Sequence, residues 1–271
     1  MIISARGSAV LVAVAATVLV GCSASPGDDA APSSAAWQAA DDGSVDADAD
    51  LASFELDVDG YWLEPPNGEG TGALEMSVAS LAPGNVEDDF DPTDCFPLYL
   101  ASSLSTVDDG GAFAGDIRVE HGWVLPEGLD IEAVWADPER SAAELITRGF
   151  ATAELPVQMV QGALDAAGAC DAYVETHDTG DGGEVVIRWS GTAATVLATE
   201  ELAGEAVRID RTVDSQVLPG LGEEELDEPL TTYLYAYGPY LFCLQISGPA
   251  DDALAASVFL GLEEHVSGVP A

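Results

Sequence analysis

Cysteine is the residue of this sequence whose surroundings point most directly to a chemical reaction. Cys22 stands between an apolar run, residues 9–20, and a polar stretch that is rich in Asp, Ser and Pro. A thiol in this place is either a structural group or the point at which the chain is cut and attached to a lipid. The residues that precede it distinguish the two.

Residues 1–21 have the parts of a secretory signal peptide. They carry one positive charge, Arg6, and an apolar run that is shorter than the roughly 20 residues of a membrane-spanning helix. The last three of these residues together with the cysteine, Leu19-Val20-Gly21-Cys22, resemble the bacterial lipobox, in which the cysteine is acylated and the chain is cut just before it. The resemblance implies a lipid anchor on Cys22 and a location on the extracytoplasmic side of the cell membrane. An ordinary secretory signal beside an incidental cysteine is the alternative.

Three further cysteines remain once Cys22 is assigned to the lipid. In an oxidising compartment we expect two of them to pair and one to stay reduced. Cys95 lies in a loop flanked by prolines and Cys170 follows a predicted helix, so these two are the favoured pair, although the sequence does not fix the connectivity. Cys243 lies in the apolar segment 240–246, where a free thiol behaves as a small hydrophobic residue.

Catalytic chemistry has little support in the sequence. The three histidines, His121, His177 and His265, are far apart, and the G-x-S-x-G elbow of many serine hydrolases does not occur. Carboxylate pairs carry no information, because 49 of the 271 residues are acidic. We therefore predict no enzymatic activity and no catalytic residues, and an unrecognised hydrolase is the lesser alternative.

Two acidic stretches contain possible metal ligands. Residues 46–57 have the alternating carboxylates of a calcium loop, but the sixth position is Leu51 where such a loop needs Gly, and the twelfth is Asp57 rather than Glu. Residues 177–184 combine a histidine with carboxylates, which is also the composition of an ordinary solvated turn. We predict no metal site and no cofactor.

The charge of the chain restricts its partners. The formal net charge is −42, with 7 basic residues and no lysine. Nucleic acid and anionic lipid head groups are repelled by such a surface, so a nucleic-acid partner is excluded. The excess of acids also has a general explanation, since it keeps an exported protein soluble.

The chain divides into three parts. After the signal peptide, residues 22–50 are rich in Ala, Ser, Asp, Pro and Gly, which predicts the lipidated cysteine followed by a disordered acidic tether. Residues 51–271 are long enough for one domain, and 48% of the sequence is hydrophobic, which is enough for a substantial core.

The folded part shows both strand-like and helix-like patterns. The expected strands are 54–59, 115–125, 129–136, 172–174, 184–189, 204–213 and the hairpin 231–246, with 73–79 as a strand or a short helix. The expected helices are 137–150, 156–169 and 253–265, and the acidic segment 222–228 is expected to be a loop. This order predicts an α+β fold, an antiparallel sheet with helices packed on one face.

Tyrosines concentrate in the predicted C-terminal hairpin. Tyr233, Tyr235, Tyr237 and Tyr240 lie within eight positions of one another. They are either core residues or an aromatic binding surface, since tyrosine suits contacts that are half apolar and half polar. An exposed aromatic edge strand would also suit a protein partner.

The order of elements is similar to that of the extracytoplasmic sensor-like domains of actinobacterial lipoproteins and of a mycobacterial serine/threonine kinase. The matching pieces are 143–170, which ends in a cysteine, and 237–266, a late strand that begins near a glycine and is followed by a helix. The resemblance implies a non-enzymatic binding or sensing module. Its partner would be a small ligand of unknown identity or, alternatively, an envelope protein that it serves as an accessory or chaperone-like subunit.

Overall fold

The computed structural model describes most of the predicted domain. The described residues are 38–40, 45–64, 75–81, 89–102, 115–135, 142–178, 183–199 and 201–268. The predicted signal peptide, Cys22 and most of the predicted tether lie outside these ranges. No helix within them is both long enough and apolar enough to cross a membrane.

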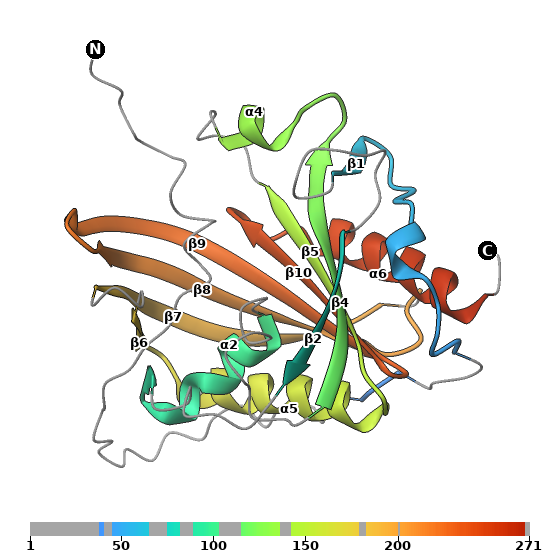
Figure 1. The fold of residues 1–271 in the computed structure, drawn as a ribbon, viewed down its shortest axis with the longest axis horizontal. Coiled ribbons are helices and arrows are strands. Elements are labelled where there is room, and N and C mark those ends of the chain that lie inside the picture. The colour runs from blue at the N-terminus through green and yellow to red at the C-terminus, as the bar shows by residue number, and fades with distance from the viewer. Residues whose placement is uncertain are drawn as a thin grey trace.

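Ten strands of the described chain form one antiparallel sheet (Figure 1). They are β1 (Tyr61–Glu64), β2 (Glu75–Leu81), β3 (Phe90–Asp91), β4 (Gly115–Pro126), β5 (Ala143–Gly149), β6 (Tyr173–Asp178), β7 (Glu184–Ala198), β8 (Glu205–Leu218), β9 (Gly222–Tyr237) and β10 (Tyr240–Ser247). Their order is β1-β4-β5-β10-β9-β8-β7-β6-β3, and β2 pairs with β4 beside this path. The strands β10, β9 and β8 are therefore central.

The helices of the described chain differ in length. They are α2 (Phe96–Ser102), α4 (Ile131–Trp135), α5 (Glu154–Ala169) and α6 (Asp252–Ser267), with short 3-10 helices η1 (Leu51–Ser53) and η3 (Thr93–Cys95). Helix α6 begins after Asp251, whose carboxylate accepts the backbone N–H of Leu254 at 2.9 Å. It ends at Gly268, where a φ of 64° favours glycine. The cap and the helix agree with the sequence prediction.

Helices pack on both faces of the sheet, so the prediction of helices on one face is wrong. Residues of α2 and α5 pack with Leu241 and Cys243 of β10 in one hydrophobic cluster. Residues of α6 pack with Phe242 and Leu244 of the same strand in a second cluster. Because successive side chains of a strand point to opposite faces, β10 is apolar on both, and each face needs its own cover. The α+β description holds, with the sheet as the dominant element.

The first predicted helix is instead a strand. Residues 143–149 form β5, which pairs with β4 and β10, and Ile146 lies opposite Cys243. Apolar residues at helical spacing suggested a helix over 137–150. A strand that is buried on both faces is apolar at most positions, and such a run also satisfies helical spacing. Residues 137–141, the predicted helix start, lie outside the described residues.

Three further assignments are corrected. The predicted strand 129–136 contains the helix α4, and the predicted strand 54–59 has no regular strand structure. The predicted acidic loop 222–228 is the exposed first half of β9, where Glu223 pairs with Val217 of β8. By contrast, α5 and the hairpins β6–β7 and β9–β10 are confirmed.

Part of the predicted tether packs against the domain (Figure 1). The backbone N–H of Asp46 donates to the Val266 carbonyl at 2.8 Å, and the Tyr240 hydroxyl donates to the Asp46 carbonyl at 2.8 Å. Further upstream, the N–H of Gln38 donates to the Glu205 carboxylate at 2.9 Å. Residues 45–50 therefore belong to the folded domain, because they complete its surface beside α6.

Candidate functional site

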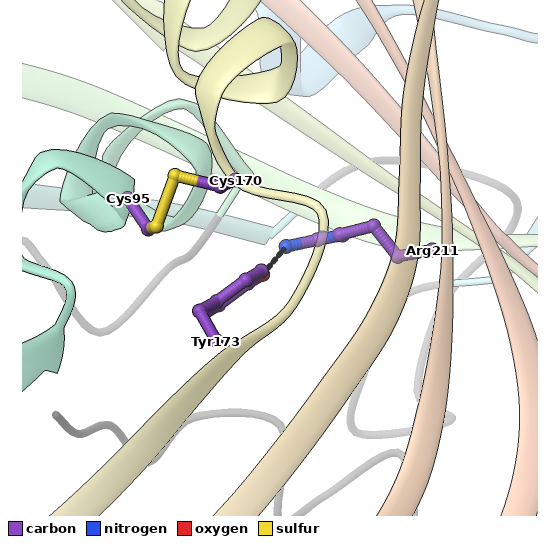
Figure 2. The surroundings of a disulfide bond; sticks show 4 residues. All are labelled: Cys95, Cys170, Tyr173 and Arg211. Atoms are coloured by element: carbon purple, nitrogen blue, oxygen red, sulfur yellow. Dashed lines mark hydrogen bonds between the residues drawn. A yellow bond between two sulfur atoms is a disulfide. The ribbon is translucent and has the colours of Figure 1, made fainter. Parts of the chain in front are cut away.

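The structure contains the disulfide that the sequence favoured. Cys95, at the end of η3, is bonded to Cys170, which follows α5, and both residues are buried (Figure 2). The bond joins two segments that are 75 positions apart in the sequence. Cys243 is free and buried, as expected, and burial raises the pKa of its thiol to about 12. A thiol in this state is a core residue rather than a nucleophile.

The four tyrosines do not form a binding surface, so that hypothesis is wrong. Tyr233, Tyr235 and Tyr240 are fully buried, and Tyr237 is 7% exposed. They lie on the central strands β9 and β10 and face α6, where the ring of Tyr235 stacks on Phe259. The hydroxyl groups of Tyr233, Tyr235 and Tyr240 donate to the Asp252 carboxylate, the Glu263 carboxylate and the Asp46 carbonyl, respectively. This interior position also removes the exposed aromatic edge on which a protein-partner hypothesis depended.

The two histidines with described side chains have different partners. His121 is 3.6 Å from the Glu144 carboxylate, and His265 bonds to the backbone carbonyl of Asp50 at 2.9 Å. The side chain of His177 lies outside the described part of the structure. Among the described residues, no group of three or more His, Cys, Asp or Glu side chains is arranged to hold a metal ion.

A cluster of polar side chains lies in the core beside the disulfide. The Arg211 guanidinium of β8 donates to the Tyr173 hydroxyl at 2.8 Å and to the Thr232 hydroxyl at 3.1 Å. Figure 2 shows the guanidinium and the phenol pointing toward each other from β8 and β6, two strands that are separated in the sheet by β7. The guanidinium also lies over the ring of Trp189. All four side chains are at least 95% buried.

A second charge lies in the same cluster. Glu175 of β6 accepts a hydrogen bond from the indole N–H of Trp189. Burial raises the pKa of Glu175 to about 7, although the Trp189 bond and the positive charge of Arg211 oppose the shift. No described carboxylate forms an ion pair with Arg211. The cluster is enclosed, so its role is to order strands β6 to β9 rather than to meet a ligand.

Sequence reasoning missed this cluster, although one signal was present. Every second residue in the middle of β8 is buried, and the residues between them are partly exposed. The buried positions are Val207, Ile209, Arg211 and Val213. Arg211 is therefore a charge at a core position. Such a residue needs polar partners from neighbouring strands, which only the register of the sheet reveals.

A groove between α6 and the facing ends of β7 and β8 is a candidate ligand site. Its volume is about 310 Å³. Seven of its nine lining residues are Val, Leu or Ala; the lining residues are Val196, Leu197, Ala198, Thr199, Leu202, Ala206, Asp252, Ala255 and Ala256. Ligand sites are typically apolar with a few fixed polar groups, and this groove has that character.

The one charged lining residue of the groove is held in place. The Asp252 carboxylate accepts two bonds from Nη1 of Arg208, each of 3.1 Å, and one from the Tyr233 hydroxyl at 2.9 Å. Arg208 also pairs with Asp210 at 3.0 Å. Burial, followed by the bond to Asp252, raises the pKa of Tyr233 above its ordinary value. Tyr233 therefore remains a protonated donor, and Asp252 has a fixed position beside a cation that it shares with Asp210.

Two other grooves are more open to solvent, and each is lined by at least two titratable side chains. One, of about 450 Å³, lies between η3, α2 and α5 and carries Asp94 and Asp165. The other, of about 400 Å³, lies between residues 54–57 and α6 and carries Glu264 and His265. Neither combines an apolar lining with a polar group fixed by several bonds, so the groove beside β7 and β8 is the stronger candidate.

No protein-family model and no curated protein matches this chain. Among solved structures, it is similar to the extracellular domain of PknH from Mycobacterium tuberculosis, with 12% identity, 74% of this chain and 86% of that chain covered, and a TM-score of 0.38. It is also similar to an uncharacterized protein from Mycobacterium smegmatis, with 11% identity, 83% and 98% covered, and a TM-score of 0.32. At these TM-scores the likeness is weak and assigns no function.

Proposed function

We propose that this chain is an exported, lipid-anchored and non-enzymatic module that binds a small ligand outside the cell membrane. The groove between α6 and the ends of β7 and β8 is the observation that carries the proposal. It combines an apolar lining with a polar group, Asp252, that is already held in one position. A site that is ordered before binding loses little conformational freedom when its ligand enters.

The proposed location has two independent supports. The sequence Leu19-Val20-Gly21-Cys22 has the order of residues at which lipoproteins are cut and acylated. The Cys95–Cys170 disulfide fits export, because disulfides persist in oxidising compartments and are rare where thiols are kept reduced. The lipid on Cys22 would then be the contact with the membrane.

The anchor is tested by changing Cys22 in the full chain. In a bacterial host that processes lipoproteins, the unchanged chain is expected in the membrane fraction, with a mass that includes the lipid. Cys22→Ala should lose that mass and leave the membrane, whereas the control Ser25→Ala should behave like the unchanged chain. Membrane association of Cys22→Ala at the unchanged level, or an unmodified Cys22, would refute the anchor.

The binding role is tested by native mass spectrometry of the full-length Cys22→Ala chain. We expect a co-purifying small molecule that dissociates on collision. Ala256→Trp should fill the groove and abolish this mass, because Ala256 lines it. Ala253→Trp is the matched control, since Ala253 is an exposed residue of the same helix outside the lining. The proposal fails if no mass is bound or if both variants lose it equally.

A further inference from the structure

We infer that the groove between α6 and the ends of β7 and β8 holds one acyl chain of an uncharged glycerolipid taken from the membrane. The inference rests on the proposed function, because it takes the anchor on Cys22 as given. It adds the chemical class of the ligand, the part of the ligand that enters the groove and the source of the ligand.

The lining of the groove suits an unbranched hydrocarbon. Ala206, Ala255 and Leu202 are its most buried lining residues, with exposed fractions of 3%, 1% and 7%. Walls made of methyl and isopropyl groups offer hydrophobic and dispersion contacts and no directional bonds. The small alanine side chains leave room along α6 that larger side chains would occupy. A flexible chain of methylene groups can follow such a channel.

The charges around the groove favour an uncharged head group. None of the lining residues is Lys, Arg or His. The nearest described cation, Arg208, is already paired with the carboxylates of Asp252 and Asp210, so it has less capacity to hold the carboxylate or phosphate of a ligand. Asp252 already receives its bonds from Arg208 and Tyr233, and an anion beside it would meet like charge. The net charge of −42 adds a general repulsion of anions. A diacylglycerol satisfies these conditions, whereas a fatty-acid anion or phosphatidylglycerol does not.

The groove also lies where the N-terminal segment meets the domain. The Glu205 N–H donates to the Gln38 carbonyl at 3.3 Å, and the Gln38 N–H returns a bond to the Glu205 carboxylate. A Cβ on Gly204 would lie 2.5 Å from the backbone nitrogen of Ala40, so the two segments touch closely. Gly204 and Glu205 stand in the sequence between the lining residues Leu202 and Ala206.

Chain length then keeps the groove close to the membrane. Gln38 lies 16 positions after Cys22 in the sequence. Even a fully extended chain of this length spans no more than roughly 55 Å. Because Gln38 is bonded beside the groove, an anchor on Cys22 confines the groove to this distance from the lipid surface. The membrane is therefore the nearest source of acyl chains.

The test uses the full-length Cys22→Ala chain and a diacylglycerol with an NBD fluorophore on one acyl chain. NBD fluorescence increases in apolar surroundings, so a saturable rise is expected. Ala256→Trp and Ala198→Trp, which narrow the groove from its two walls, should each weaken binding at least about tenfold. Ala253→Trp and Ala193→Trp, at exposed positions of the same two elements outside the lining, should bind as tightly as the parent.

Circular dichroism and thermal unfolding select the variants that retain the fold. Unchanged affinity in a folded Ala256→Trp or Ala198→Trp chain would overturn the assignment of the groove. Equal affinity for NBD-labelled fatty acid or phosphatidylglycerol would overturn the choice of an uncharged head group. Binding by Cys22→Ala that is absent in the lipidated chain would assign the groove to the protein's own anchor and overturn the membrane source.

These results are distinguishable from failure of the proposed function. If Cys22 carries no lipid, the anchor fails whatever the groove binds. If Cys22 is lipidated and Ala256→Trp removes a bound molecule other than a glycerolipid, the proposed function stands and the acyl-chain inference is wrong.

Discussion

The guanidinium carbon of Arg211 lies 4.6 Å from the centroid of the Trp189 ring. The same indole donates its N–H to the carboxylate of Glu175. One neutral ring therefore contacts both charges of the buried cluster, its face meeting the cation and its edge the carboxylate. This arrangement matches the charge distribution of an aromatic ring, which is negative on the face and positive at the edge.

Replacement of Arg211 by Met should reduce the free energy of unfolding by about 3 kcal/mol. The change leaves Tyr173 and Thr232 without a donor and removes the positive charge near Glu175. Chemical denaturation measures the loss. Arg188→Met is the control, because Arg188 is half-exposed and pairs with an exposed carboxylate, a contact worth at most about 1 kcal/mol. Similar losses in both variants would contradict a special role for the buried cluster.

Stability should decrease as the pH rises from about 4.5 to about 7. Burial raises the pKa of Glu175, and that of Glu120, from 4.5 to about 7 in the folded chain. Between these values the folded state retains protons that the unfolded state has lost, so rising pH favours unfolding. Over this pH range, the ionisation of each group can lower the free energy of unfolding by up to about 3 kcal/mol.

Urea denaturation at several pH values between 4 and 8 measures this slope. Glu175→Gln, which mimics the protonated group, should flatten it, whereas Glu184→Gln at an exposed position should leave it unchanged. A Glu175→Gln chain with the parental pH dependence would show that Glu175 ionises normally in the folded protein.

Loss of the disulfide should destabilise the domain by about 4 kcal/mol, since the bond closes a loop of 75 residues. The double variant Cys95→Ala with Cys170→Ala tests this by thermal or urea unfolding. Cys243→Ala removes a buried sulfur without breaking a cross-link, so it should cost only about 1 kcal/mol. If the double variant is no less stable than Cys243→Ala, the cross-link does not limit the unfolded state as expected.

Cys243 should resist alkylation in the folded protein. Its side chain is fully buried, and burial raises the pKa of the thiol to about 12, so little thiolate forms at pH 8. Iodoacetamide followed by mass spectrometry should leave the folded Cys22→Ala chain unmodified and add one label in denaturing urea. Rapid labelling without denaturant would show that the thiol is accessible.

Local signals predicted the elements that they specify. Asp251 is followed by apolar residues at helical spacing, and the structure places a helix there with Asp251 as its cap. Alternation in 184–189 marked a strand, and the Gly/Asp-rich turn before it marked the hairpin with β6. The favoured pair Cys95 and Cys170 is also the observed one, because the end of α5 was predicted correctly.

Features set by distant parts of the chain were not predictable in the same way. The acidic segment 222–228 has the composition of a loop, yet it pairs with β8 and extends the sheet into solvent. The groove takes Ala256 from α6 and Ala198 from β7, which are far apart in the sequence, and no local pattern connects them. The groove forms because α6 packs on the second face of the sheet. The sequence predicted helices on one face only, so the groove could not be predicted from it.

The strand β10 contributes side chains to two hydrophobic clusters of the domain. Phe242 packs in the cluster that contains α6, and Cys243 packs in the cluster that contains α2 and α5. If this strand separates from its neighbours, α6 and α5 lose their support at the same moment. The layers therefore cannot melt one after the other, and the domain should behave as a single cooperative unit. Calorimetry would then record one heat-absorption peak, with equal calorimetric and van't Hoff enthalpies.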